Sequence, residues 1–333
     1  MRHGELARVE KRLQDVPAGG LTITGDLPSG QEPGFLAKPS VVRTDGKGMI
    51  EAYSVYLGVD ASYTLFLAGE VTFHHGAASS VLEMFYCRSG RVGWNMQGGT
   101  AVYLGAGDLT VHSAACCADS TMMFPSGYAE GISIAVDLPC LAAHCPEILQ
   151  GSDIDFEKMQ AALCSGNPAA IPACPELEGI FGPLYAVNPA RRRPYLQLKV
   201  QELLLYLMDF QPGQRELTQY VTQQTELIRE IQQQLTQHLD RRWTIEEISK
   251  QYLINTSTLK EVFKAVYGLP IATYMKEYRV RQAMKLLRET DAPVSEIADM
   301  VGYRTQGKFS EAFRDVTHML PTEYRKSGCA CKE

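Results

Sequence analysis

The sequence predicts an α+β protein in which a β-rich N-terminal domain precedes an all-helical C-terminal domain. Two observations lead to this prediction. Between about Glu51 and Leu138, short apolar stretches alternate with glycine-containing breaks, which is typical of antiparallel strands joined by turns. From Leu217 onward, apolar residues instead recur at three- and four-residue spacing, as in amphipathic helices. The length of 333 residues is sufficient for two or three domains.

Composition excludes several classes of protein. Hydrophobic residues make up 45% of the chain and charged residues 21%, values typical of a globular protein. No apolar run approaches the roughly 20 residues that span a bilayer, and the charged N-terminus does not resemble a signal peptide. The nine cysteines are scattered and lack the paired spacing of a zinc finger. We therefore expect a cytoplasmic protein with reduced thiols and no membrane segment.

Three segments are expected before the helical domain. Residues 1–48, rich in glycine and proline, are predicted to form a loosely ordered N-terminal arm. Residues 49–138 are predicted to form the β domain. Its expected strands are Thr64–Ala68, Val81–Cys87, Val92–Met96, Ala101–Leu104, Leu109–Val111 and Gly131–Val136. Because alternate residues of a strand point the same way, Val92, Trp94 and Met96 should share a face.

Residues 139–215 are predicted to be a helical linker and dimerisation region. Within it, the stretch from Pro194 to Phe210 is predicted to be a helix, begun by Pro194 and stopped at Pro212-Gly213. Its apolar residues are Leu196, Val200, Leu203, Leu204 and Leu207. This face either packs on its own domain, which is the commoner case, or forms a dimer surface.

Residues 216–333 contain an internal repeat. The segment from Leu259 to Val266 resembles the segment from Phe309 to Val316, about 50 residues later. A short helix precedes each, and Gly302 lies where the second unit must turn. This arrangement predicts two helix-turn-helix units. We expect the N-caps of the second helices to be Thr256 or Ser257 in the first unit and Thr305 in the second.

A long helix is expected between the two units, from Pro270 to Thr290. At about 20 residues it would span ~30 Å, which suits two recognition helices that enter successive major grooves about 34 Å apart. Its inward residues are expected to be Tyr274, Val280, Ala283, Leu286 and Leu287. Residues 223–327 carry 16 Lys/Arg against 14 Asp/Glu, whereas the whole chain has a net charge of −6. The helical region is therefore the part best suited to a polyanion.

The helical region resembles the AraC/XylS family of bacterial transcription regulators over about 100 residues. The resemblance rests on Pro270, Tyr274, Arg279, Ala283 and Leu286-Leu287 in the linking helix, on Ile297-Ala298, Gly302-Tyr303, Phe309-Ser310 and Phe313-Arg314 in the second unit, and on Pro321 and Tyr324-Arg325. Leu253 and His318 depart from the pattern, because they stand where the family often has glycine.

The resemblance implies a double-stranded promoter DNA partner. Exposed side chains near the start of each recognition helix should reach base edges, and those at the rim should reach phosphate. The candidate DNA-binding residues are Thr256, Ser257, Thr258, Lys260, Glu261, Lys264, Arg304, Thr305, Gln306, Lys308 and Arg314. Among these, Gln306 suits adenine, Arg304 suits guanine or phosphate, and Lys264 and Arg314 suit the rim.

The resemblance also implies that the β domain is a cupin-like β-barrel that senses an effector. The spacing Glu83-x6-Gly90 and the turn Gly105–Asp108 resemble parts of cupin motifs. The positions of a cupin His-x-His pair hold Ala77 and Ser79, so no metal, cofactor or catalytic residue is expected. The candidate effector-binding residues are Glu83, Phe85, Tyr86, Arg88, Trp94, Met96 and His112, several of which could equally be plain core.

The sequence therefore predicts a regulator, not an enzyme: a DNA-binding activator controlled by a small-molecule effector. A homodimer and contact with RNA polymerase are expected from the same resemblance. An alternative is a ligand-independent regulator whose N-terminal domain serves dimerisation or binds a protein partner. The cysteines, including Cys116-Cys117 and Cys329-x-Cys331, could sense oxidants or bind a soft metal, although buried small hydrophobes and a disordered tail are the simpler explanation.

Overall fold

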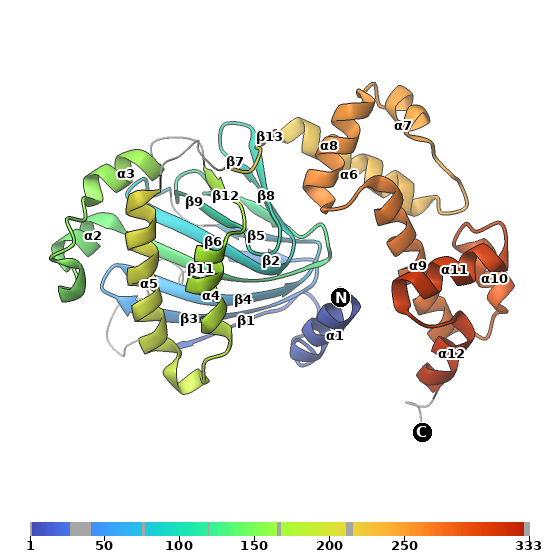
Figure 1. Ribbon diagram of the computed structural model, residues 1–333, viewed down its shortest axis with the longest axis horizontal. Helices are drawn as coiled ribbons and strands as arrows, with labels where there is room; N and C mark the ends of the chain where they lie inside the picture. Colours follow the sequence, from blue (N-terminus) through green and yellow to red (C-terminus); the bar gives the residue numbers. More distant parts are fainter. Residues whose placement is uncertain are drawn as a thin grey trace. The chain divides into compact units, whose positions relative to one another are not determined.

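The computed structural model describes residues 2–26, 41–74, 77–118, 120–164, 168–210 and 216–329 (Figure 1). The chain divides into two compact units, Met1–Thr222 and Gln223–Glu333. Among the described residues, no helix is long and apolar enough to cross a membrane.

The N-terminal unit contains two β-sheets. The first has seven strands in the order β1-β3-β4-β11-β6-β9-β12, of which only the β1–β3 pair is parallel. Its strands are β1 (Leu21–Asp26), β3 (Lys47–Tyr56), β4 (Val59–Leu67), β6 (Val81–Gly90), β9 (Leu109–Ser113), β11 (Tyr128–Asp137) and β12 (Ala169–Ile171). The second has six antiparallel strands in the order β13-β8-β7-β10-β5-β2. They are β2 (Val41–Thr44), β5 (Glu70–His74), β7 (Val92–Met96), β8 (Thr100–Leu104), β10 (Thr121–Met123) and β13 (Tyr220–Val221).

The two sheets pack face to face through an apolar layer. Phe66, Phe85 and Cys87 contribute to it from the first sheet, and Trp94 and Met96 from the second. The expected face of Val92, Trp94 and Met96 is therefore confirmed. Five of the six strands expected from the sequence lie within observed strands, and the sixth, Thr64–Ala68, extends one residue beyond the end of β4. The β-rich N-terminal unit is confirmed as a pair of sheets, and the cupin-like barrel stays a prediction.

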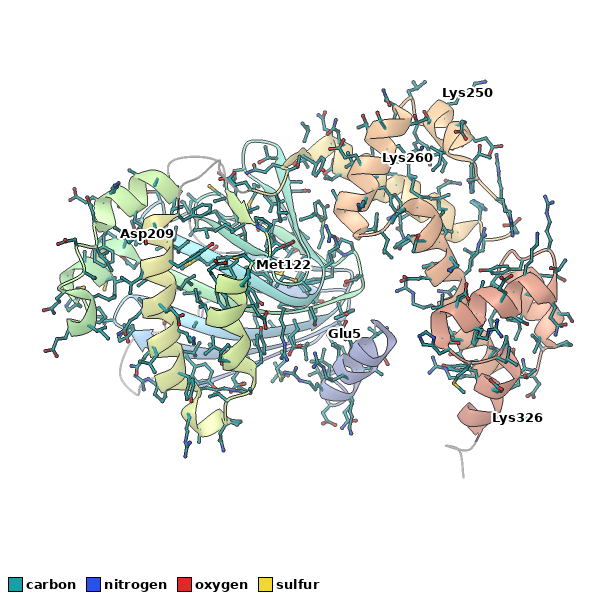
Figure 2. All side chains as sticks on the ribbon, viewed as in Figure 1. Glu5, Met122, Asp209, Lys250, Lys260 and Lys326 are labelled. Carbon is teal, nitrogen blue, oxygen red and sulfur yellow. The ribbon has the colours of Figure 1, made fainter. Side chains whose placement is uncertain are left out.

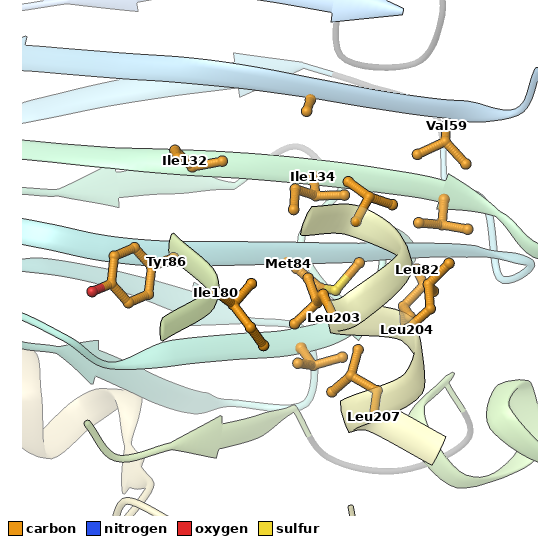
Figure 3. Packing of buried hydrophobic residues seen from close by; sticks show 14 of the residues in the cluster. Val59, Leu82, Met84, Tyr86, Ile132, Ile134, Ile180, Leu203, Leu204 and Leu207 are labelled. Atoms are coloured by element: carbon orange, nitrogen blue, oxygen red, sulfur yellow. The ribbon is translucent and has the colours of Figure 1, made fainter. Parts of the chain in front are cut away.

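Helices cover the other face of the seven-stranded sheet (Figure 1). They are α2 (Leu138–Ala143), α3 (Phe156–Cys164), α4 (Pro175–Phe181) and α5 (Arg192–Asp209), with short 3₁₀ turns η2 (Glu147–Leu149), η3 (Gly182–Tyr185) and η4 (Pro189–Arg191). Figure 3 shows Leu203, Leu204 and Leu207 of α5 beside Leu82 and Met84 of β6.

The expected apolar face of α5 is thus confirmed as a packing surface within its own unit. Its five leucine and valine residues are all buried. The segment predicted as a helical linker belongs to the N-terminal unit, because it supplies both this cover and strand β12. Its part in dimerisation stays a prediction.

The described part of residues 1–48 is ordered, in contrast to the expected loose arm. Helix α1 (Arg2–Arg12) is followed by β1, which pairs with β3. Val9, Leu13 and Val16 are buried against Leu65 and Tyr128. The expectation was wrong because a short helix and an edge strand of this kind are stabilised by non-local contacts rather than by a strong local pattern. Residues 27–40 of the predicted arm lie outside the described residues.

A buried carboxylate holds α1 on the sheet. Glu130 of β11, whose side chain is 3% exposed, accepts hydrogen bonds from Arg8 at 2.7 Å and Arg12 at 2.5 Å. The guanidinium of Arg88 lies 3.5 Å from the same carboxylate. Tyr128 adds a hydrogen bond of 2.9 Å to Glu5 of the helix. Because a buried carboxylate is costly without partners, these arginines couple the helix to the stability of the sheet.

We expect Glu130→Gln to lower the free energy of unfolding of the chain by about 1–3 kcal/mol, because it removes charged hydrogen bonds whose arginine ends are partly exposed to solvent. Urea unfolding followed by circular dichroism measures the change. Glu10→Gln, an exposed change on the same helix, is the control and should alter stability by less than about 0.5 kcal/mol. Equal stability of the two variants would contradict the clamp.

The C-terminal unit consists of seven helices among its described residues. They are α6 (Thr222–Gln237), which begins at the boundary residue, α7 (Ile245–Gln251), α8 (Thr256–Tyr267), α9 (Ile271–Glu289), α10 (Val294–Met300), α11 (Gln306–Thr317) and α12 (Pro321–Cys329). The pairs α7–α8 and α10–α11 form the two predicted helix-turn-helix units. The all-helical C-terminal part of the predicted fold is confirmed.

Left-handed residues terminate or join these helices. Gly302 has φ +80°, and a Cβ there would lie 1.9 Å from the carbonyl oxygen of Leu239, so only glycine fits. Leu253 (φ 50°) and His318 (φ 62°) adopt the same region without being glycine. The two departures from the family pattern therefore keep the turn geometry at a conformational cost of about 1 kcal/mol each.

Candidate DNA-contacting surface and effector site

The first recognition helix is α8, and its N-cap is Asn255. The side chain of Asn255 accepts hydrogen bonds from the backbone N–H of Ser257 at 2.8 Å and from its hydroxyl at 2.6 Å. The expectation that Thr256 or Ser257 caps the helix was therefore wrong by one residue. Asparagine satisfies the first N–H groups as well as serine does, and sequence alone does not separate adjacent capping residues.

The two sides of α8 differ sharply. Leu259, Val262 and Phe263 are buried and fix the helix in its unit. On the opposite side Ser257, Lys260, Glu261 and Lys264 are exposed, and Thr256 and Thr258 are partly so. Figure 2 marks Lys260 of α8 among the side chains of this unit. All six predicted residues of the first unit are thus accessible.

The second recognition helix, α11, repeats this arrangement. Thr305 is its N-cap, as predicted, and its side chain accepts a hydrogen bond from the backbone N–H of Lys308 at 3.4 Å. Phe309, Ala312 and Phe313 form the buried side. The five predicted residues of this unit are all exposed: Arg304, Thr305, Gln306, Lys308 and Arg314. The helix therefore presents two cations and a glutamine amide near its N-terminus, groups that suit phosphate and base edges.

Helix α9 holds the two units together. At its start Tyr274 packs on Phe263 and Tyr267 of α8, with ring centroids 5.4 and 4.9 Å apart. Toward its end Val280, Ala283 and Leu287 join the core of the second unit. Four of the five residues expected to face inward are buried, and Leu286 is partly buried. With 19 residues, α9 is about 28 Å long, which keeps the two recognition helices at a fixed separation.

Sequence comparison identifies this arrangement. The family model described as a helix-turn-helix domain matches residues 248–327. The transcriptional activator RhaR of Mannheimia succiniciproducens is 36% identical over 69 residues, which are 21% of this chain and 25% of that protein. The arabinose operon regulatory protein of Escherichia coli is 32% identical over 73 residues, 22% of this chain and 25% of that one. Over these residues, the C-terminal unit is similar to the helix-turn-helix domain of AraC/XylS-type transcription regulators.

This AraC/XylS match spans about a quarter of the length of these curated relatives. Among solved structures, ToxT of Vibrio cholerae strain SCE256, crystallised with an unsaturated fatty acid, covers 82% of this chain and 96% of its own. It is 11% identical, with a TM-score of 0.33, a likeness too weak to support an argument about the N-terminal unit.

The structure separates the predicted effector residues into two groups. Phe85, Trp94 and Met96 lie in the layer between the sheets, where the Phe85 and Trp94 rings meet edge to face at 5.3 Å. Tyr86 lies on the helix-covered face, where its ring stacks on Phe181 at 4.2 Å and its hydroxyl donates to Glu178 at 3.0 Å. Tyr86 therefore does not line one cavity with Phe85, because neighbouring strand residues face opposite ways.

Arg88 is also engaged away from the layer between the sheets. Its guanidinium lies over the ring of Tyr185, 3.9 Å from the centroid, and close to Glu130. Its position therefore indicates that Arg88 stabilises the buried Glu130 carboxylate together with Arg8 and Arg12 of α1.

The other two predicted residues, Glu83 and His112, lie directly opposite each other on β6 and β9. Cys117 joins them, and one ligand atom from each of the three residues lies within 4.8 Å of the other two. The thiol of Cys117 donates to the Glu83 carboxylate at 2.7 Å, and His112 Nδ1 lies 3.2 Å from the Ser113 carbonyl oxygen. Burial and the Glu83 charge raise the pKa of the Cys117 thiol above its ordinary value.

Cys117 was not among the predicted site residues. Glu83 is a carboxylate in an otherwise apolar strand, but the cysteine that it contacts lies on a turn after another strand, β9. Only the register that pairs β6 with β9 brings the three groups together. Among the other cysteines, Cys87 is buried, which raises its pKa to about 12 and makes its thiol unreactive. Cys331 lies outside the described residues.

Proposed function

We propose that the protein is a DNA-binding transcription regulator whose C-terminal unit reads promoter DNA with α8 and α11. The observation that carries the proposal is the pair of capped recognition helices, each with a buried apolar side and an exposed polar side, joined by one rigid helix. The likeness of the C-terminal unit to AraC/XylS-type regulators supports it. The family is one of transcription regulators, not of enzymes, and the cytoplasm is the expected compartment.

We expect Lys308→Ala to weaken DNA binding about equally on all sequences, and to lower the slope of log K against log salt by about one, because it removes one phosphate contact. The measurement is fluorescence anisotropy with a duplex selected from a random-sequence library by the full-length protein. Gln306→Ala should instead relax one base position.

Lys285→Ala is the matched control, because Lys285 is an exposed lysine on α9, outside both recognition helices. It should leave the salt slope unchanged. If Lys308→Ala binds the duplex with the wild-type affinity and salt slope, α11 does not contact DNA as proposed.

The N-terminal unit is proposed to bind a small-molecule effector between its two sheets. Supporting this, the layer combines aromatic side chains of Phe85 and Trp94 with the polar groups of Glu83 and His112, a mixture typical of ligand sites. An effector that favours one conformation of this unit would then change how the chain occupies DNA, most simply as an activator that contacts RNA polymerase.

Native mass spectrometry of gently purified full-length protein tests the effector. We expect an additional mass with a stoichiometry of one per chain, which is lost in a Trp94→Ala variant and retained in a Trp243→Ala variant. Trp243 lies in the C-terminal unit and therefore serves as a control for loss of an indole. Retention of the ligand by both variants would place it elsewhere in the chain.

The chain is proposed to form a homodimer through the outer side of α5. Tyr195, Leu198 and Leu205 recur there at three- and seven-residue spacing and are 39%, 60% and 42% exposed. Large apolar side chains aligned on the solvent side of a helix are the pattern of a helix-to-helix interface. The inner side of the same helix is already occupied by the sheet.

We expect the double change Leu198→Glu/Leu205→Glu to convert the protein from dimer to monomer in sedimentation velocity, because four carboxylates cannot be buried across the interface. Ile148→Glu is the control, since Ile148 is 68% exposed on η2, away from α5, and should leave the dimer intact. A dimer that survives the double change would contradict this surface and favour another.

A further inference from the structure

The layer between the sheets contains three potential metal ligands of different chemistry. Glu83 offers a carboxylate, His112 an imidazole and Cys117 a thiol. Two of the three, His112 and Cys117, are 4% exposed, in an otherwise apolar region. We propose that Glu83, His112 and Cys117 form a binding site for a single zinc ion.

The three ligand atoms lie close to the separations that one ion requires. Zinc binds thiolate sulfur at about 2.3 Å and imidazole nitrogen or carboxylate oxygen at about 2.0–2.2 Å, so two ligand atoms on one ion lie no more than about 4.4 Å apart. The three ligand atoms here lie within 4.8 Å of one another. Binding therefore requires the side chains to rotate so that the ligand atoms move closer together, and the fourth tetrahedral position stays open.

The backbone around the three residues is fixed. Glu83 and His112 are directly opposite in the β6–β9 ladder, which places both side chains on the same face. The turn carrying Cys117 is held by hydrogen bonds from Cys116 N–H to the Ser113 carbonyl and from Ala114 N–H to the Val81 carbonyl, at 2.9 and 2.8 Å. Such a site needs no large rearrangement to bind an ion.

The imidazole has the outer contact that zinc ligands usually have. Nδ1 of His112 faces the Ser113 carbonyl at 3.2 Å, so a ring that donates there presents the lone pair of Nε2. In metal sites this second contact fixes the tautomer and the ring orientation.

The donor set selects zinc among the common ions. One thiolate excludes a site built for magnesium or calcium, which prefer oxygen ligands. The carboxylate is too hard for a copper(I) site, and a single imidazole does not make the facial triad of non-haem iron. One sulfur, one nitrogen and one oxygen donor match borderline zinc, and also cobalt(II), which serves as its spectroscopic probe.

The site has a structural consequence for the unit. Cys117 lies on the connection that leaves β9 of the seven-stranded sheet and enters β10 of the six-stranded sheet. The backbone N–H of Gln97, just after β7, donates a hydrogen bond to the backbone carbonyl of Cys116 at 2.9 Å. A bound ion would therefore tie the two sheets together at this crossover. The proposal stands independently of DNA binding. Because it assigns Glu83 and His112 to the ion, a small-molecule effector in the same layer would contact these two groups only through the ion.

The test is titration of the chelator-treated full-length protein with Co²⁺. We expect a thiolate-to-cobalt charge-transfer absorption that saturates at one ion per chain and is displaced by Zn²⁺. Zn²⁺ should also raise the thermal unfolding midpoint, because an ion that binds only the folded state stabilises it. If the wild-type protein shows no charge-transfer absorption with Co²⁺, the proposed site is wrong, regardless of the results with the variants.

Variants locate the ligands. Cys117→Ser should abolish the charge-transfer absorption and the Zn²⁺-induced shift in unfolding midpoint, whereas Cys116→Ser, the adjacent half-buried cysteine, should retain both. Glu83→Gln should keep the absorption but weaken Co²⁺ binding by more than about tenfold. If circular dichroism shows that Cys117→Ser does not fold, the weakened Co²⁺ binding of Glu83→Gln still tests the site. Absorption that survives Cys117→Ser, or that is lost in Cys329→Ser/Cys331→Ser, would overturn the assignment.

Discussion

The seven-stranded sheet is covered on both faces, and much of the N-terminal unit follows from that constraint. Helices α2–α5 cover one face, and the second sheet covers the other. A carboxylate in such a sheet must find a partner or be neutralised. Glu130 finds arginines on α1, and this anchors the N-terminal segment. Glu83 accepts a hydrogen bond from the Cys117 thiol and lies opposite His112. These three residues form the only such cluster of potential metal ligands among the described residues. Polar residues in this sheet thus mark its special positions.

In the C-terminal unit, the residues that stabilise the fold and those proposed to contact DNA lie on opposite sides of the same helices. The buried sides of α8 and α11 hold them against α9, through Phe263 and Tyr274 in one unit and Phe309 and Phe313 in the other. The exposed sides contribute little to folding, so their residues are free to suit a nucleotide sequence.

Sequence predicted the helical unit better than the β-rich unit for a physical reason. Helix positions, the turn at Gly302 and the cap at Thr305 are set by residues a few places apart, so a local pattern is sufficient. The six expected strands were also found, because each has its own alternation. What could not be predicted was non-local: the parallel pairing of β1 with β3, the clamp on Glu130, and the meeting of Cys117 with Glu83 and His112. All three depend on register between segments far apart in the chain.

Strand β6 connects the two surfaces that a regulated protein would need. Its odd-numbered residues Glu83 and Phe85 face the layer between the sheets, and its even-numbered residues Leu82 and Met84 pack with α5 (Figure 3). A ligand that displaces the first group must move the second, because close-packed side chains transmit small shifts. The outer side of α5 would move with its inner side. A single strand therefore provides a direct physical route from the proposed effector layer to the proposed dimer surface, without any intervening flexible segment.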